Sequence, residues 1–208
     1  MTILFPHVPK TGGTSLLKSL SAAYGDKLLL DYHHNSYRGK FKLAVDSALI
    51  AFRKKELTNN YKVIFGHFDP RVYNKLGLTR ALFFRDPEDR AVSHYQYLLK
   101  RKKIPLEFSM SDFVKQPRIQ NLYSFYCNGV SIEDLAFVGI TERYTESLCL
   151  FNKIFGVELT EHRERINYTK PVEKTEIGVC QSINQEIYER ALKRFDFLIK
   201  KHGLDNAF

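Results

Sequence analysis

The chain has 208 residues and a net charge of +9, with 44% hydrophobic and 26% charged residues. This length suits one domain with a sizeable core, and the composition excludes a chain that is disordered, collagen-like or coiled-coil throughout. The surplus of basic residues indicates an anionic partner without naming it. Nucleic acid, an acidic membrane, a phosphorylated cosubstrate and an anionic glycan all carry the matching charge.

Cysteine content and hydropathy indicate the cellular location of the protein. Its three cysteines, Cys127, Cys149 and Cys180, are too few and too scattered for a disulfide framework or a zinc site. No apolar stretch approaches the roughly 20 residues of a membrane-spanning helix. The first residues resemble neither the basic region nor the cleavage site of a signal peptide. We therefore expect a cytoplasmic protein without a membrane span.

Short apolar runs alternate along the chain with longer amphipathic segments, and such runs are typical of strands buried on both faces. The expected strands are 2–8, 27–30, 62–65, 80–84 and 136–140. The expected helices are 14–24, 41–57, 87–102, 142–155 and 183–201. This alternation predicts an α/β fold with a mainly parallel central sheet flanked by helices. We expect one domain over residues 1–208, with a helical insertion around 104–135.

A glycine-rich segment, PKTGGTS at 9–15, joins the first expected strand to the first expected helix. Its two glycines permit positive φ and close approach of a ligand to the backbone. Its lysine supplies a cation, its hydroxyl residues supply donors, and the following helix N-terminus attracts anions. The alternative is a plain strand-to-helix turn capped by Thr14. We predict a phosphate-binding loop formed by Lys10, Thr11, Gly12, Gly13, Thr14 and Ser15.

The order of residues in this segment differs from that of known nucleotide-binding motifs. In the Walker A motif the lysine follows the glycines and stands next to a hydroxyl that binds Mg²⁺. Here Lys10 precedes both glycines, which places it at the strand end beside the reacting side of a phosphate. The segment also lacks the GxGxxG pattern of dinucleotide-binding domains.

A second segment, FFRDPEDRAVSHY at 83–95, also crosses from a strand to a helix. Asp86 is suited to cap that helix and Pro87 to its first position. Arg85 is then at the carboxyl end of a strand and Ser93 about two turns into the helix. Because parallel sheets bind ligands at these ends, Arg85 and Ser93 could hold a second phosphate. The alternative is an arginine paired with a nearby aspartate and an ordinary helical serine.

A third segment, FGHF at 65–68, places His67 after an apolar strand. A neutral imidazole there suits a general base near about pH 7, although an isolated histidine at a strand end is more often structural. No pair of histidines has metal-ligand spacing supported by carboxylates or cysteines, so we expect no metal.

The order of these three segments resembles that of sulfotransferases, and specifically the heparan sulfate 2-O-sulfotransferase-like family with its bacterial relatives. The resemblance rests on FPHVPKTGGTSL at 5–16, FGHF at 65–68 and FFRDPEDRAVSHYQY at 83–97, with weaker matches at 119–129, 138–148 and 166–174. It implies a P-loop-like three-layer fold and the sulfuryl donor 3′-phosphoadenosine-5′-phosphosulfate (PAPS).

The resemblance also implies roles for individual residues. The segment 9–15 would bind the 5′-phosphosulfate of PAPS, and Arg85 and Ser93 would bind its 3′-phosphate. His67 would be the base, and the segment 167–170 would close over the donor. In the mechanism that we expect, Lys10 stabilises charge on the leaving phosphate. The chain is shorter than Golgi members and shows no anchor like theirs. We therefore expect a soluble, bacterial-type enzyme that acts on a small-molecule or glycan hydroxyl.

Two other functions stay open on the sequence alone. A P-loop kinase or NTPase would use ATP and Mg²⁺, although the lysine lies on the wrong side of the glycines for it. A non-catalytic nucleic-acid or polyanion-binding protein would use the basic run 100–103 and the basic last helix. Such runs are more often solvated helix ends, and the sequence has no RNP-type signature, so we expect no nucleic-acid partner.

Overall fold

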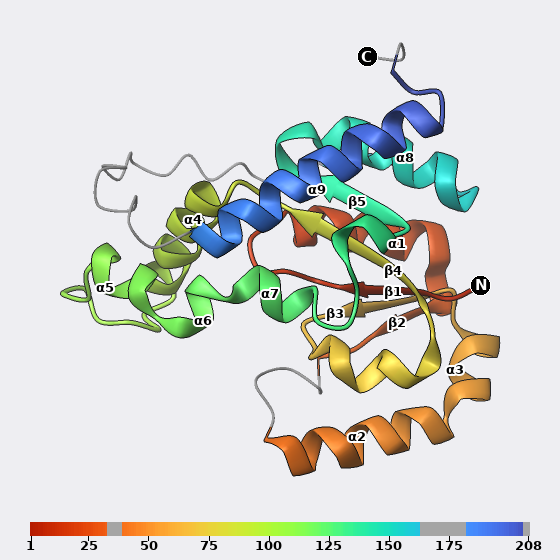
Figure 1. The fold of residues 1–208 in the computed structure, drawn as a ribbon, viewed down its shortest axis with the longest axis horizontal. Helices are drawn as coiled ribbons and strands as arrows, with labels where there is room; N and C mark the ends of the chain where they lie inside the picture. The colour runs from red at the N-terminus through yellow and green to blue at the C-terminus, as the bar shows by residue number, and fades with distance from the viewer. Residues whose placement is uncertain (33–38, 163–181, 206–208) are drawn as a thin grey trace.

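Five parallel strands form the central sheet of the computed structural model, which describes residues 1–32, 39–162 and 182–205 (Figure 1). They are β1 (Ile3–Pro6), β2 (Leu28–Leu30), β3 (Val63–Gly66), β4 (Thr79–Phe84) and β5 (Phe137–Ile140), in the spatial order β2-β3-β1-β4-β5. All residues of β1, β3 and β5 are buried, which explains their continuous apolar sequences. The predicted α/β fold with a mainly parallel sheet is confirmed.

Helices connect the strands. They are α1 (Gly13–Tyr24), α2 (Lys40–Phe52), α3 (Lys54–Asn60), α4 (Pro87–Lys100), α5 (Met110–Lys115), α6 (Pro117–Gln120), α7 (Leu122–Tyr126), α8 (Tyr144–Phe155) and α9 (Ser182–Lys201). Short 3₁₀ turns are η1 (Gly25–Lys27), η2 (Pro70–Leu76), η3 (Ile132–Asp134) and η4 (Thr141–Arg143). The insertion expected around 104–135 contains α5, α6, α7 and η3. The helix expected over 41–57 is instead two helices that meet at Arg53.

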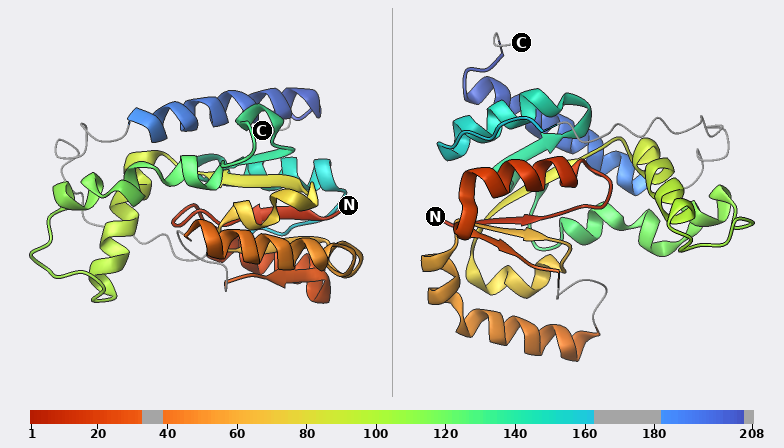
Figure 2. Two further views of the ribbon diagram at one scale, coloured as in Figure 1. Left: turned by 60° about the horizontal axis from the view of Figure 1, so that its bottom comes forward. Right: turned by 180° about the vertical axis from the view of Figure 1, so that it is seen from behind.

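Helices cover both faces of the sheet (Figure 2). Side chains on one face, such as Phe5 and Phe65, pack in a cluster with residues of α1 and α8. Their neighbours Leu4 and Ile64 point to the other face, where they pack with residues of α2, α3 and η2. The β4 and β5 part of this second face is covered by α7 and α9 (Figures 1 and 2). The three layers match the three-layer arrangement expected from the sequence.

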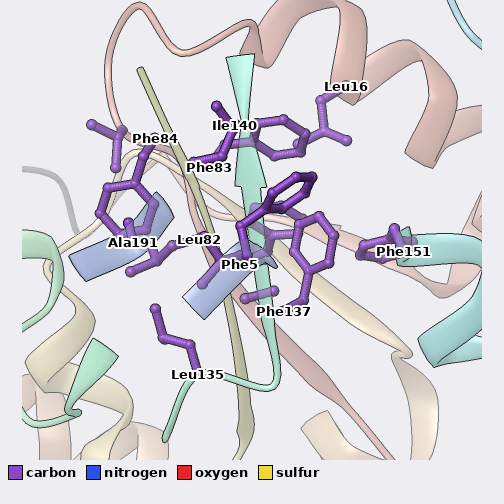
Figure 3. Close-up of a cluster of buried hydrophobic side chains, with 14 of the residues drawn as sticks. Phe5, Leu16, Leu82, Phe83, Phe84, Leu135, Phe137, Ile140, Phe151 and Ala191 are labelled. Atoms are coloured by element: carbon purple, nitrogen blue, oxygen red, sulfur yellow. The ribbon is translucent and has the colours of Figure 1, made fainter. Parts of the chain in front are cut away.

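Aromatic rings fill the centre of the larger cluster (Figure 3). The ring of Phe5 stacks against that of Phe83 with centroids 6.2 Å apart, and it meets the edge of Phe137 at 6.0 Å. Phe151 of α8 lies on the same group at 6.0 Å from Phe5. Because close-packed interiors resist deformation, this cluster fixes the position of β1 and the loop that follows it.

The strand order brings the three predicted segments to one edge of the sheet. β1 pairs with β3 on one side and with β4 on the other, all in parallel. The glycine-rich loop follows β1, His67 follows β3 and Arg85 follows β4. Their carboxyl ends therefore meet at the edge where open α/β sheets bind ligands. In the described parts of the chain, no helix is long and apolar enough to cross a membrane.

Candidate functional site

The loop between β1 and α1 leaves the N-terminus of α1 open to an anion. Gly12 is the N-cap residue with a left-handed φ of 81°, no side chain of the described residues caps the helix, and its first turn has no acidic residue. The first helical bond runs from the Leu16 N–H to the Gly12 carbonyl at 3.1 Å. The N–H groups ahead of it and the positive end of the helix dipole suit a phosphate.

The hydroxyl residues of this loop differ in their surroundings. Thr11 is buried, and its Oγ1 donates to the carbonyl of Val8 at 2.9 Å, so it braces the loop. Thr14 is exposed and Ser15 partly buried in the first turn of α1. Of the predicted hydroxyl donors, those of α1 are therefore better placed to reach a ligand than that of Thr11.

Gly13 has a role that differs from the predicted one. It has no positive φ and is the first residue of α1. A Cβ atom at this position would lie 1.6 Å from Nε2 of His7. The imidazole of His7 therefore lies directly against the backbone of Gly13. Of the two glycines, Gly12 alone adopts the left-handed conformation, whereas Gly13 provides space for a ring.

The rings of His7 and His67 stack with centroids 4.2 Å apart and an interplanar angle of 22°. Nδ1 of His67 lies 2.7 Å from the backbone carbonyl oxygen of His7. Because a carbonyl oxygen only accepts hydrogen bonds, Nδ1 of His67 carries the proton. In the neutral ring Nε2 then keeps its lone pair, which is the form that a general base requires.

Burial keeps both rings of this stack neutral. It lowers the pKa of His67, although the hydrogen bond to His7 opposes the shift. Burial also lowers the pKa of His7 well below its ordinary value, with further lowering by His67 and Lys10. Neither ring nitrogen of His7 has a hydrogen-bond partner among the described residues. His7 thus acts as an uncharged support between the loop and His67, and sequence reasoning gave it no role.

Lys10 and Arg85 bring positive charge to the same edge. Nη1 of Arg85 donates to the Lys10 carbonyl at 3.3 Å, which ties the loop to the end of β4. Nζ of Lys10 lies 4.7 Å from the ring centroid of Tyr97 on α4, a cation–π contact. Burial, followed by the charge of Arg85, lowers the pKa of Lys10. The two cations therefore face a common region, as expected for a site that binds phosphate groups.

The N-terminus of α4 differs from that of α1 because a side chain at its start binds its free N–H groups. The carboxylate of Asp86 accepts hydrogen bonds from the N–H groups of Glu88 and Asp89, each at 3.0 Å. Pro87 is in the first turn, so the predicted cap is confirmed. Ser93 lies further along α4 and is partly buried. Binding of an anion near α4 would therefore use side chains and not the helix end.

Arg90, between Arg85 and Ser93, is a buried cation that sequence reasoning missed. It is 0% exposed, and none of its three guanidinium nitrogens has a hydrogen-bond partner in the described part of the chain. The guanidinium lies 5.8 Å from the ring of Tyr123. The hydroxyl of Tyr123 accepts from the Arg85 N–H at 3.2 Å and donates to the Arg85 carbonyl. A buried cation without an acidic partner is costly unless a ligand compensates its charge.

A third imidazole, that of His94, belongs to the same group. Burial, followed by the charges of Arg90, Lys10 and His67, lowers the pKa of His94 to about 4. Cationic side chains and neutral imidazoles thus lie at the same edge of the sheet. The cations can bind anions, and a neutral imidazole can accept a proton. Among the residues described, no three His, Cys, Asp or Glu side chains are grouped to hold a metal ion.

The segment 167–170, which the resemblance implies would close over the donor, lies outside the described residues. The described part of the site therefore consists of the loop after β1, His67 with His7, Arg85 after β4, and the first two turns of α4.

Comparisons with known proteins support the fold. No family model and no curated protein matches the chain. Among solved structures, it is similar to a sulfotransferase from Alicyclobacillus acidocaldarius, with a TM-score of 0.52 and 15% sequence identity. The similarity covers 96% of this chain and 95% of that one. The chain thus has the fold of sulfotransferases along nearly its whole length, while the more specific resemblance to the heparan sulfate 2-O-sulfotransferase-like family stays a prediction.

Proposed function

We propose that this protein is a sulfotransferase that moves a sulfuryl group from PAPS to a hydroxyl of a small-molecule or glycan acceptor. One observation carries the proposal. An open helix N-terminus after β1, a neutral imidazole with a proton-accepting Nε2 after β3, and a pair of arginines after β4 meet at one edge of a sheet. The fold in which they meet is similar to that of a sulfotransferase.

The residues at this edge fit a donor with two separate phosphate positions. In the proposal, Lys10 and the first N–H groups of α1 hold the 5′-phosphosulfate, because that helix end is uncapped and free of acidic residues. Arg85 and Ser93 hold the 3′-phosphate. Arg90 and Arg85 both contact Tyr123, so Arg90 adds positive potential near Arg85, and the bound phosphate compensates its buried charge.

Bound PAPS supplies a sulfuryl group attached to a phosphate that can leave. Nε2 of His67 takes the proton of the acceptor hydroxyl while the acceptor oxygen bonds to sulfur and the bond between sulfur and the phosphate oxygen breaks. Lys10 and the loop N–H groups stabilise the charge that develops on that oxygen, a form of electrostatic preorganisation. The products are a sulfate ester and adenosine 3′,5′-bisphosphate, with the proton on His67. In this proposal a lysine, and not a metal ion, stabilises the leaving group.

An acceptor screen tests the proposal. The full chain is incubated with radiolabelled PAPS and with oligosaccharides, phenols or lipids, and with His67→Ala as the control. We expect label to enter at least one acceptor class and the His67→Ala variant to transfer at least about 10²-fold more slowly. Parallel reactions contain ATP–Mg²⁺ in place of PAPS. Phosphoryl transfer from ATP without any sulfuryl transfer from PAPS would favour the kinase alternative and contradict the proposal.

A further inference from the structure

Helix α2 exposes a row of large apolar side chains. Phe41, Val45, Leu49 and Phe52 are 85%, 43%, 59% and 91% exposed. Their spacing of four, four and three residues places them on one side of the helix. The opposite side, which includes Ile50, packs with η2 in the smaller core cluster. The helix is therefore apolar on the side that faces away from the protein as well as on the side that faces it.

The row on α2 differs from the other exposed apolar side chains. Eleven large hydrophobic residues are exposed in the described part of the chain, and four of them form this row. Single exposed apolar residues are normal, whereas a contiguous row marks an interaction surface. Figures 1 and 2 show α2 at the outer margin of the molecule, on the side opposite α9. The surface is thus accessible and separate from the site at the sheet edge.

Basic side chains stand at both ends of the apolar row. Residues 40–56 contain five basic residues and two acidic ones, and Glu56 is bound to Arg53 at 2.7 and 2.9 Å. The first turn of α2 has lysines and no acidic residue, which opposes the helix dipole, so helix stability does not explain these lysines. The exposed basic residues are Lys40, Lys42, Arg53, Lys54 and Lys55.

We propose that α2 docks on the surface of an anionic lipid bilayer, with Phe41 and Phe52 inserted at the boundary of the acyl chains and the basic ends at the headgroups. An interfacial helix combines these features, namely an apolar face with aromatic residues and flanking lysines and arginines. A bilayer surface is continuous and deformable. It can therefore accommodate a protruding helix while its anionic headgroups contact the basic residues at both ends. The proposal rests on this surface alone and does not depend on sulfuryl transfer.

A second copy of the chain fits this surface less well. Because both ends of α2 are basic, two α2 helices that pair in either direction place lysines and arginines against one another. Like charges brought together at an interface disfavour association. The charge pattern therefore favours an anionic surface over self-association.

Vesicle flotation of the full chain tests the proposal. The vesicles are phosphatidylcholine with and without phosphatidylglycerol, and no donor or acceptor is added. The apolar variant is Phe41→Ser with Phe52→Ser, and its control is Phe197→Ser, which changes another exposed phenylalanine that is 52% exposed. The charge variant is Lys54→Glu with Lys55→Glu, and its control is Lys200→Glu with Lys201→Glu on α9. All seven side chains are exposed, so we expect the variants to keep native circular dichroism.

We expect binding only to the vesicles that contain phosphatidylglycerol. Each α2 variant should lower the partition coefficient about tenfold or more, and each control should change it about twofold or less. No binding to anionic vesicles would overturn the proposal. An equal loss of vesicle binding in the charge variant and in its control would also overturn the proposal, because it would show attraction by net charge alone. Sedimentation velocity that reveals a dimer dissociated by the phenylalanine substitutions would assign the row to self-association instead.

Discussion

The backbone carbonyl of His7 accepts the Nδ1 proton of His67 at 2.7 Å while the two rings stack 4.2 Å apart. His7 thereby fixes the tautomer of His67 through the hydrogen bond and the plane of its ring through stacking. The ring of His7 in turn lies against Gly13, at the start of the helix proposed to bind the donor. The proposed base and the loop after β1 are therefore parts of one packed unit, which would keep their relative positions fixed during sulfuryl transfer.

The His67 tautomer leads to a prediction for the protein without ligands. Nitrogen-15 NMR near about pH 7 should show Nδ1 of His67 protonated and Nε2 unprotonated, because a carbonyl faces Nδ1. Burial lowers the pKa of His67, and the base works only when neutral, so activity should be full above that pKa and fall as the pH drops through it. The acid limb of kcat/KM should then lie below the ordinary imidazole pKa of about 6.5. An Nε2-protonated ring would remove His67 from the role of base.

Lys10 predicts a pair of variants that lose the same activity but differ in stability. Its φ of 72° is in the left-handed region, which is unfavourable for a residue with a Cβ atom. Lys10→Ala and Lys10→Gly both remove Nζ, so each should lower kcat about 10²-fold or more. Lys10→Gly should be more stable than Lys10→Ala by about 1 kcal/mol, measured by urea unfolding, because glycine adopts this φ without strain. Equal stabilities would show that the loop carries no strain at this residue.

Arg90 should strengthen ligand binding but lower the stability of the protein without ligand. Arg90→Met replaces a buried cation, which has no hydrogen-bond partner for its guanidinium among the described residues, by an apolar side chain of similar length. We expect it to raise the free energy of unfolding by about 1–4 kcal/mol. The same variant should bind adenosine 3′,5′-bisphosphate more weakly. The control is Arg101→Met, an exposed arginine just beyond α4, which should change stability by about 0.5 kcal/mol or less. A destabilised Arg90→Met would mean that the guanidinium serves the fold and not a ligand.

The partly buried His94 predicts loss of stability in acid. Its pKa is about 4 in the folded state against 6.5 as the ordinary value, so above 6.5 it is neutral in both states. As the pH falls from 6.5 towards 4, the unfolded chain binds a proton that the folded chain does not, and stability decreases. By about pH 5 the loss amounts to on the order of 2 kcal/mol. His94→Gln should flatten this decrease in urea unfolding curves, and an unchanged slope would assign the decrease to other groups.

The sequence predicted the arrangement of the site better than its internal contacts. Strands β1, β3, β4 and β5 are short, largely buried apolar runs, so the pattern located them and the segments that follow them, whereas β2 is only partly buried. The cap by Asp86 and Pro87 depends only on local chemistry and is confirmed. The break at Arg53 was not predictable in this way, because no glycine or proline marks it.

The contacts that sequence reasoning missed join residues far apart in the chain. His7 supports a residue 60 positions away, and Arg90 lies on a tyrosine that binds Arg85 from 38 positions away. The role of Gly13 as space for a ring also depends on packing. The only sequence signals were a histidine two residues before the glycine-rich segment and a second arginine in the RDPEDR stretch.

Calorimetric titration tests the central claim, that this sheet edge binds a donor with a 3′-phosphate. The ligands are adenosine 3′,5′-bisphosphate, adenosine 5′-monophosphate and ATP–Mg²⁺, and the proteins are the native chain, Arg85→Ala and Ser93→Ala. We predict that the native chain binds the bisphosphate about tenfold or more tightly than the monophosphate, and that both variants lose most of this difference. Equal affinities of the native chain for the two nucleotides, or tighter binding of ATP–Mg²⁺, would contradict the claim.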